Sequence, residues 1–428
     1  MRFAWMRWVA AVLLPAPVVA QVVPPTVTTT IETPADAIRQ DAGEYARAFG
    51  VGAAEAERRL IALDASVVAT DRIADAYRDR LAGISIEHRP ALRIVVALTG
   101  DAPVPDEAVS AGGLTLPIIF HTGAKATRDR VIWAMTYHQA AIRAALPRPP
   151  AMGLDPRTGE LVVVIGSTGG QPREALRARI AAIAGVPTRL RVLDQVDVNL
   201  SAPVPLAPVP LALGGARLEG TSPDDGKRYL CTAGFAVTDG TRYGIATAAH
   251  CVDQLDYVAA DHSIAPLPFV HQWGWGYQDV QINQAAGPLP GLLFADTAKT
   301  IERPVLGQRA RDSTRAGEFV CHRGERTGYS CATVELTDFA PAGDLCGGPC
   351  LPTWVTVAGP TCKGGDSGAP VFVGTTAFGI VKGATYRDGA CAFYFYMSTD
   401  YIPQPWHLVL GAPIPPVAPP VIGARGSP

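Results

Sequence analysis

The sequence predicts two differently built parts, an α/β domain in the first half and an all-β barrel or sandwich in the second. All 8 cysteines lie between Cys231 and Cys391, so the first half has none. Helical and strand patterns alternate from about residue 35 to 198, whereas short strands with glycine-rich turns follow a proline-spaced stretch. The length of 428 residues fits more than one domain, since a domain usually has roughly 100–200 residues.

The composition excludes two broad classes of protein. Hydrophobic residues make up 48% of the chain and charged residues 18%, which excludes a disordered or highly charged tail protein. The formal net charge is −2, from 37 basic and 39 acidic residues, and no segment is strongly basic. We therefore expect no nucleic-acid partner held by general electrostatics.

The first 20 residues have the pattern of a secretory signal peptide. Arg2 and Arg7 precede an apolar run over 9–19, and the small residue Ala20 follows it. The run is shorter than the roughly 20 residues of a membrane span, so we expect cleavage after residue 20 and no membrane span. An uncleaved anchor is the alternative. Export to the extracellular space or the periplasm also explains the cysteines, because disulfides persist there.

Residues 21–198 have the pattern of a small α/β domain. Strands are expected over 92–98 and 161–165, the second after a turn at 155–159. Apolar residues at helical spacing predict one helix over about 127–146, with His138 on its core face. A second helix is expected between Pro172 and Gly185.

Residues 199–212 form a proline-rich linker, and residues 213–410 have the pattern of an all-β domain. Asp239-Gly240 predicts a hairpin between strands over 229–237 and 241–247. Further strands are expected over 354–357, 370–373, 377–381 and 392–397. Residues 411–428 form a second proline-rich segment, a tail.

Three residues of the second half fit nucleophilic catalysis. Ser367 lies in the run Gly-Gly-Asp-Ser-Gly at 364–368, and His250 ends the run Thr-Ala-Ala-His at 247–250. A serine hydroxyl needs a base to take its proton, and histidine suits that role when a carboxylate orients it. Asp279 is the expected carboxylate, and the backbone N–H groups of Gly365 and Ser367 would stabilise an oxyanion.

These segments, in the order His250, Asp279, Ser367, resemble the chymotrypsin-like serine peptidases, most nearly the secreted bacterial group of streptogrisins and alpha-lytic protease. The resemblance implies two six-stranded antiparallel β-barrels with the catalytic residues in the cleft between them. Residues 45–51 and 155–159 also resemble the pro-regions of that group. Residues 21–198 are therefore expected to act as a folding helper and inhibitor, removed by self-processing within 199–212.

Asp279 is preferred to the other aspartates because it precedes an alternating strand, Val280-Gln281-Ile282, as in the family. Asp296 is the second candidate. The resemblance also implies that Asp366 has an internal partner, for which an arginine is the candidate.

Eight cysteines permit 105 pairings, so the sequence alone does not fix the disulfides. The resemblance implies Cys231–Cys251, Cys321–Cys331 and Cys362–Cys391, which leaves Cys346–Cys350. A zinc site of Cys346, Cys350 and His322 is the alternative for that last pair. We expect no metal and no other cofactor.

Substrate preference is expected to be neutral and apolar. No carboxylate occurs in 359–363, where a family member that cleaves after Lys or Arg has one. The resemblance places Lys382, Gly383 and Ala384 at the substrate-binding wall, where the backbone pairs with an extended peptide.

The sequence therefore predicts a secreted, monomeric serine endopeptidase whose partners are a protein or peptide substrate and its own pro-region. Two alternatives remain. One is a non-catalytic binding protein on the same fold. The other is an esterase that uses Ser367, Asp388 or Asp400, and His407, although its Gly-x-Ser-x-Gly turn is broken by Ala369.

Overall fold

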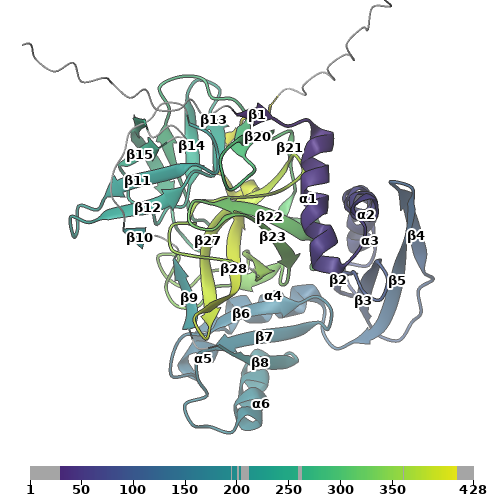
Figure 1. Cartoon of the computed structure of the whole chain (residues 1–428). Coiled ribbons are helices and arrows are strands. Elements are labelled where there is room, and N and C mark those ends of the chain that lie inside the picture. The colour runs from purple at the N-terminus through teal and green to yellow at the C-terminus, as the bar shows by residue number, and fades with distance from the viewer. Residues whose placement is uncertain are drawn as a thin grey trace, which may run out of the picture.

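The computed structural model describes residues 29–193, 195–199, 202–203, 212–258, 263–359 and 361–411 (Figure 1). The expected signal peptide and nearly all of the two proline-rich segments lie outside these residues. Within the described ranges, no helix combines the length and the apolar character that crossing a membrane requires.

The first N-terminal unit, residues 29–125, packs three helices with a four-stranded sheet of order β2-β3-β5-β4. Helix α1 begins with a capping box, since Thr33 and Asp36 each bond the other's backbone, and it ends at Gly50 in the left-handed conformation. The core includes Leu63, Ile84 and Val96. The elements are β1 (Thr30–Ile31), α1 (Pro34–Phe49), α2 (Ala53–Ala65), α3 (Val67–Ala76), β2 (Leu81–Glu87), β3 (Arg93–Thr99), β4 (Glu107–Ala111) and β5 (Leu114–Ala124).

The second N-terminal unit, residues 126–193, has its own core between three helices and the strands β6, β7 and β8. The predicted single helix over 127–146 is wrong, because the helix breaks at His138, which has non-helical dihedrals. His138 is half-buried at the edge of the Trp133 ring rather than in the core. The elements are α4 (Arg128–Tyr137), α5 (Gln139–Ala144), β6 (Ala151–Asp155), β7 (Glu160–Ile165), α6 (Arg173–Ala184) and β8 (Thr188–Val192).

Barrel one is a closed antiparallel ring in the order β11, β12/β13, β14, β18, β17/β16, β15. The predicted strand over 229–237 is interrupted at Ala233-Gly234, and Pro268 separates β16 from β17. Each interrupted pair therefore acts as one bent strand, and the ring has six. The elements are β11 (Arg217–Thr221), β12 (Arg228–Thr232), β13 (Phe235–Thr238), β14 (Tyr243–Thr247), β15 (Leu255–Val258), β16 (Ile264–Leu267), β17 (Phe269–Trp273) and β18 (Val280–Gln284).

Barrel two closes through the order β27-β26-β22-β23-β25-β28, with β28 pairing back to β27. The expected pair of six-stranded barrels is therefore confirmed. The barrel strands are β22 (Phe319–Gly324), β23 (Gly328–Val334), β25 (Val355–Ala358), β26 (Pro370–Val373), β27 (Thr376–Arg387) and β28 (Ala390–Ser398). The remaining short elements are β9 (Gln195–Asn199), β10 (Ala202–Pro203), β19 (Leu292–Phe294), β20 (Ile301–Pro304), β21 (Gly307–Gln308), η1 (Arg311–Ser313), β24 (Asp338–Ala340), η2 (Thr399–Tyr401) and β29 (His407–Leu408).

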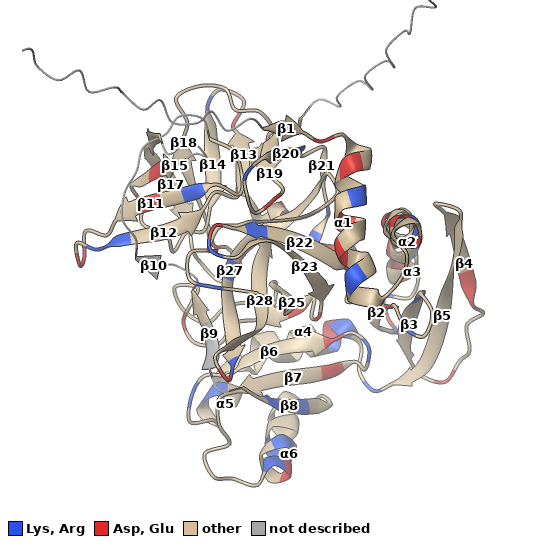
Figure 2. Cartoon of the chain, in the orientation of Figure 1, with Lys and Arg blue, Asp and Glu red and all other residues tan. Residues whose placement is uncertain are grey.

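The N-terminal units join the barrels through shared sheets as well as side chains (Figure 1). Strand β24 extends the β6-β7-β8 sheet by pairing antiparallel with β6, and β1 pairs parallel with β20. Helix α1 lies against barrel two, where Tyr45 packs edge-on to Phe319. Figure 2 shows Lys, Arg, Asp and Glu interspersed along the ribbon of both halves.

Candidate active site

His250 follows strand β14 of barrel one, in a loop tied back to β12 by the Cys231–Cys251 disulfide. Asp279 directly precedes β18, the next strand of the ring beside β14. Because β14 and β18 are antiparallel neighbours, the end of one and the start of the other lie at the same edge of the sheet. That edge therefore brings His250 and Asp279 together from positions 29 residues apart.

Ser367 lies in a tight loop before β26 of barrel two. Barrel one anchors this loop, because Thr232 N–H donates to the Ser367 carbonyl at 2.7 Å and Thr232 Oγ1 donates to the Gly365 carbonyl at 2.8 Å. The loop needs glycine at two positions. Gly365 and Gly368 have φ of +108° and +86°, and a Cβ on Gly368 would lie 2.0 Å from Thr247 Oγ1.

The three side chains form one hydrogen-bonded chain. The Asp279 carboxylate accepts from His250 Nδ1–H at 2.8 Å through Oδ2 and from His250 backbone N–H at 3.2 Å through Oδ1. With the proton on Nδ1, His250 Nε2 accepts from Ser367 Oγ–H at 2.6 Å. This is the geometry in which histidine takes a serine proton while a carboxylate fixes its tautomer.

Asp279 is almost fully buried, and burial alone would raise the pKa of its carboxyl. The interactions with His250 and Lys382 outweigh burial and hold the pKa at about 2. The Asp279 carboxyl is therefore ionised near neutral pH.

Gly365 and Ser367, predicted to supply the oxyanion hole, flank Asp366 in the nucleophile loop. The Gly365 and Ser367 carbonyls both bond to Thr232, so the backbone of the loop is fixed on both sides of Asp366. Among the described residues, neither N–H donates to a carbonyl or side chain.

Among the described residues, Asp366 accepts hydrogen bonds from four donors, and none of them is an arginine side chain. Its carboxylate accepts from the backbone N–H groups of Arg326, Thr327 and Lys363 at 2.9–3.2 Å and from Thr327 Oγ1 at 2.9 Å. The prediction of an arginine side chain as the partner of Asp366 is therefore wrong, although the backbone N–H of Arg326 is one of the donors. The sequence carries no signal for backbone donors of this kind.

The structure joins the four cysteine pairs named above, Cys231–Cys251, Cys321–Cys331, Cys346–Cys350 and Cys362–Cys391. Cys346 and Cys350 are therefore not thiolate ligands. His322 is bonded to Thr327 and Ser330 and packs on Tyr394, so the zinc alternative has no support in the structure.

The alternative candidates for the catalytic acid and base, Asp296, Asp400 and His407, have other hydrogen-bond partners. Asp296 accepts hydrogen bonds from Thr300 and Ile301 within its own turn. Asp400 accepts from Gln308 and from the Arg311 backbone, and His407 bonds the Pro405 carbonyl. The structure does not bring Asp400 and His407 to Ser367, which removes the esterase arrangement that used them.

The three predicted substrate-wall residues divide into two roles. Gly383 and Ala384 pair antiparallel with Asn199 and Val198 of β9, so a segment of the same chain already lies on this strand. The side chain of Lys382 instead turns inward, is 1% exposed, and lies 3.3 Å from Asp279 Oδ2. Sequence reasoning missed this contact, although a lone charged residue inside the apolar run 377–385 was a signal.

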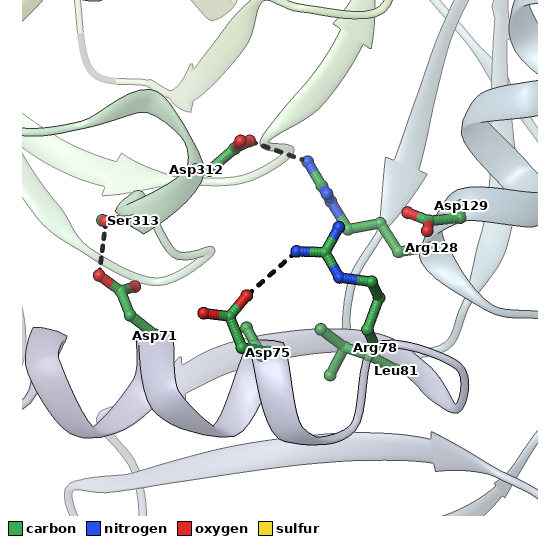
Figure 3. Close-up of a pocket in the computed structure, with 9 residues that line it drawn as sticks. Asp71, Asp75, Arg78, Leu81, Arg128, Asp129, Asp312 and Ser313 are labelled. Carbon is green, nitrogen blue, oxygen red and sulfur yellow. Dashed lines mark hydrogen bonds and ion pairs between the residues drawn. The ribbon is translucent and has the colours of Figure 1, made fainter.

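One pocket lies at the site, and others lie beside the N-terminal units. A pocket of about 610 Å³ opens beside His250 and is lined by Tyr229, Val252, Asp253 and Gln272 among others. A second pocket, of about 270 Å³, lies between α3, the start of α4 and η1 (Figure 3). Charged side chains line it, and Figure 3 shows Asp71 bonded to Ser313 and Arg128 paired with Asp312.

The two barrels of residues 212–411 have the fold of the chymotrypsin-like serine peptidases, and His250, Asp279 and Ser367 meet between them. The chain is similar to streptogrisin-C of Streptomyces griseus, with 26% identity over 199 residues. That match covers 42% of this chain and 38% of streptogrisin-C, so it spans well under half of the relative's length. No family model matches the chain.

Solved structures similar to this chain include two bacterial proteases. Thermobifida fusca protease A is 22% identical, with a TM-score of 0.38, and the match covers 47% of this chain and 100% of that one. Nocardiopsis protease is also 22% identical, with a TM-score of 0.37 and coverage of 47% and 98%.

Proposed function

We propose that the protein is a secreted serine endopeptidase, made as a precursor, in which Ser367, His250 and Asp279 form the catalytic triad. The observation that carries the proposal is the continuous hydrogen-bonded chain from Asp279 through His250 to Ser367 Oγ. Four disulfides in the barrels support export, because such bonds persist outside the reducing cytosol. The non-catalytic alternative is not favoured, since it would give no reason for the complete triad.

In the proposed reaction, His250 Nε2 takes the Ser367 proton as Oγ attacks the peptide carbonyl carbon. The N–H groups of Gly365 and Ser367 stabilise the negative oxygen of the tetrahedral intermediate. His250 then gives its proton to the leaving amine, the C–N bond breaks, and an acyl-enzyme remains on Ser367. A water molecule, deprotonated by His250, hydrolyses this ester and restores the serine.

Residues 29–199 would inhibit the precursor. Strand β9 is paired with β27 along Gly383 and Ala384, and Ser367 itself is 0% exposed. Val198 packs on the apolar cluster of barrel two that contains Val381 and Ala384. We infer that β9 lies where the N-terminal part of a substrate binds, and that self-processing cuts the chain within 199–212.

The same contact supports the proposed preference for neutral, apolar residues before the cut. Val198 lies against apolar side chains, and 359–363 contains no carboxylate that would attract Lys or Arg. The pocket beside His250 would then hold the residues that follow the cut. A cleavage profile from a peptide library dominated by Arg or Lys before the cut would contradict this preference.

The central test is the intact mass of the secreted chain, compared between the wild type and Ser367→Ala. We expect a shortened chain of the wild type and full-length precursor of the variant. A fluorophosphonate should label Ser367 of the shortened wild-type chain, while Ser330→Ala, a serine of barrel two away from His250, should leave the labelling unchanged. A wild type that is neither processed nor labelled would refute the function.

A further inference from the structure

A buried lysine lies directly beneath the proposed triad. Lys382 is on β27, within the apolar run 377–385, and its side chain is 1% exposed. Burial of an ammonium group is costly unless an opposite charge compensates it. Burial lowers the pKa of the Lys382 ammonium, and the Asp279 carboxylate opposes that shift. A buried lysine therefore needs a structural reason, whereas a lysine exposed to solvent does not.

The groups around Nζ favour the charged form of Lys382. Nζ lies 3.3 Å from Asp279 Oδ2, the same oxygen that accepts from His250 Nδ1–H at 2.8 Å. On another side, the ring centroid of Trp354 is 5.3 Å from Nζ, within cation–π range. In the described ranges Nζ has no well-aligned hydrogen-bond acceptor, so the ion pair with Asp279 is its main polar contact.

Few titratable groups act on Lys382. Asp279, before β18, is the one charge that perturbs it among the described residues, and His250 Nδ1 bonds the same carboxylate oxygen. Ser367 Oγ lies 3.4 Å from the Lys382 carbonyl, so the backbone of Lys382 also borders the nucleophile. Trp354 is uncharged. The site thus has one carboxylate shared by two partners, the His250 imidazole and the Lys382 ammonium.

We propose that Lys382 is a positioning residue of the triad: its ammonium holds the Asp279 carboxylate against His250 and lowers the pH below which His250 is lost as a base. The proposal rests on the proposed peptidase function and adds a fourth member to its machinery. With Lys382 charged, the carboxylate and ammonium together are neutral, and protonating His250 adds an uncompensated positive charge. Without the ammonium, the bare Asp279 carboxylate would attract that proton more strongly.

The test compares pH profiles of kcat/KM for the wild type, Lys382→Met and Lys382→Arg, all expressed as the full chain and allowed to process. Methionine keeps an unbranched chain of similar length but removes the charge. We expect the acid limb of Lys382→Met to move up by about one pH unit, and kcat/KM well below the limb to fall about tenfold. Lys382→Arg keeps a positive charge and should retain most of the wild-type limb.

Lys299→Met is the matched control, since Lys299 is a mostly buried lysine paired with Glu325 in a different part of the barrels. Its acid limb should coincide with that of the wild type. An unmoved limb in Lys382→Met, with the wild type active, would overturn the proposal for Lys382 and leave the peptidase function intact. An inactive, unlabelled wild type would overturn the function itself.

A second measurement does not depend on activity or on a foldable Lys382 variant. In the Ser367→Ala precursor, NMR titration of the Lys382 side-chain nitrogen reports its charge directly. We expect Lys382 to be an ammonium throughout pH 5–8. A neutral amine in that range would overturn the proposal, because an uncharged Lys382 cannot compensate Asp279.

Discussion

The two N-terminal units contact the barrels with charges of opposite sign. The first unit presents carboxylates to arginines of the barrel half, and the second unit presents arginines to carboxylates. The ion pairs of the first unit are Glu32 and Asp41 with Arg303, Asp64 with Arg309, and Asp71 with Arg315. Those of the second unit are Arg128 with Asp338 and Asp312, Arg143 with Asp344, and Arg191 with Glu335.

The opposite charges of the two contacts specify which N-terminal unit binds to which surface of the barrels. Either unit, placed on the other's surface, would bring like charges together, and such a pairing is strongly disfavoured. The two contacts also differ in how deeply their arginine side chains are buried. The arginines of the first contact are 0–8% exposed, and those of the second are 20–29% exposed. Four predictions test whether the first contact is the more sensitive one, each made on the Ser367→Ala precursor so that self-processing does not interfere.

Arg303→Met should have the largest effect. It leaves Glu32 and Asp41 buried without their shared cation, and removing one partner of a buried ion pair costs about 3–5 kcal/mol. The free energy of unfolding from urea titration measures the loss. The control is Arg39→Met, which removes an exposed ion pair on α1, the helix that carries Asp41. It should change the free energy of unfolding by less than about 0.5 kcal/mol. Equal effects of the two variants would contradict the role of burial.

Lowering the pH should loosen the first contact through His88. Tyr45 O–H donates to Nδ1 at 2.7 Å, and Nε2–H donates to the Gly317 carbonyl at 2.7 Å. Burial lowers the pKa of His88 from 6.5 to about 4, despite its bond to Gly317. Between pH 6.5 and 4, His88 is mostly protonated in the unfolded chain and mostly neutral in the folded one. This part of the stability is therefore complete above pH 6.5 and is lost as the pH falls toward 4.

The pKa shift corresponds to about 3 kcal/mol across that window. We expect His88→Gln, which does not titrate, to flatten the dependence of the urea midpoint on pH between 6.5 and 4. His121→Asn changes an exposed histidine of the same unit and should leave the dependence unchanged. A wild-type midpoint that is constant from pH 6.5 to 4 would disprove the assignment.

Arg128→Met should weaken the second contact by a smaller amount, about 2 kcal/mol. Asp338 is fully buried, but Arg311 of its own half also pairs with it, so the carboxylate keeps one cation. Burial would raise the pKa of Asp338, and the charges of Arg311 and Arg128 hold it at about 2. Urea unfolding gives the change, and a loss as large as that of Arg303→Met would show that Arg311 does not compensate.

Asp344→Asn should have the smallest effect, at most about 0.5 kcal/mol, because its partner Arg143 keeps a hydrogen bond to the Gly343 carbonyl. The same urea titration measures the change in the free energy of unfolding. A loss above about 1.5 kcal/mol would mean that exposed pairs also hold the second unit in place.

Sequence patterns predicted the regular elements well where local chemistry decides them. The Asp239-Gly240 hairpin and the helix between Pro172 and Gly185 are present as predicted, because turn and cap residues act within a few positions. The helix over 127–146 was predicted without its break at His138. Strand β24 was missed entirely, since a three-residue strand exists only because β6 of a distant segment pairs with it.

By itself, the sequence determined the residues of the proposed triad, His250, Asp279 and Ser367, and the glycines of the loop around Ser367. It also determined that a cysteine-free half precedes a half that contains all 8 cysteines. Only the tertiary structure decided which groups perturb that chemistry. Lys382 lies beside Asp279, Asp366 is held by backbone N–H groups, and the two N-terminal units bind with opposite charges. These are contacts between residues far apart in the chain, and the distances that set their strength depend on how the barrels and units pack.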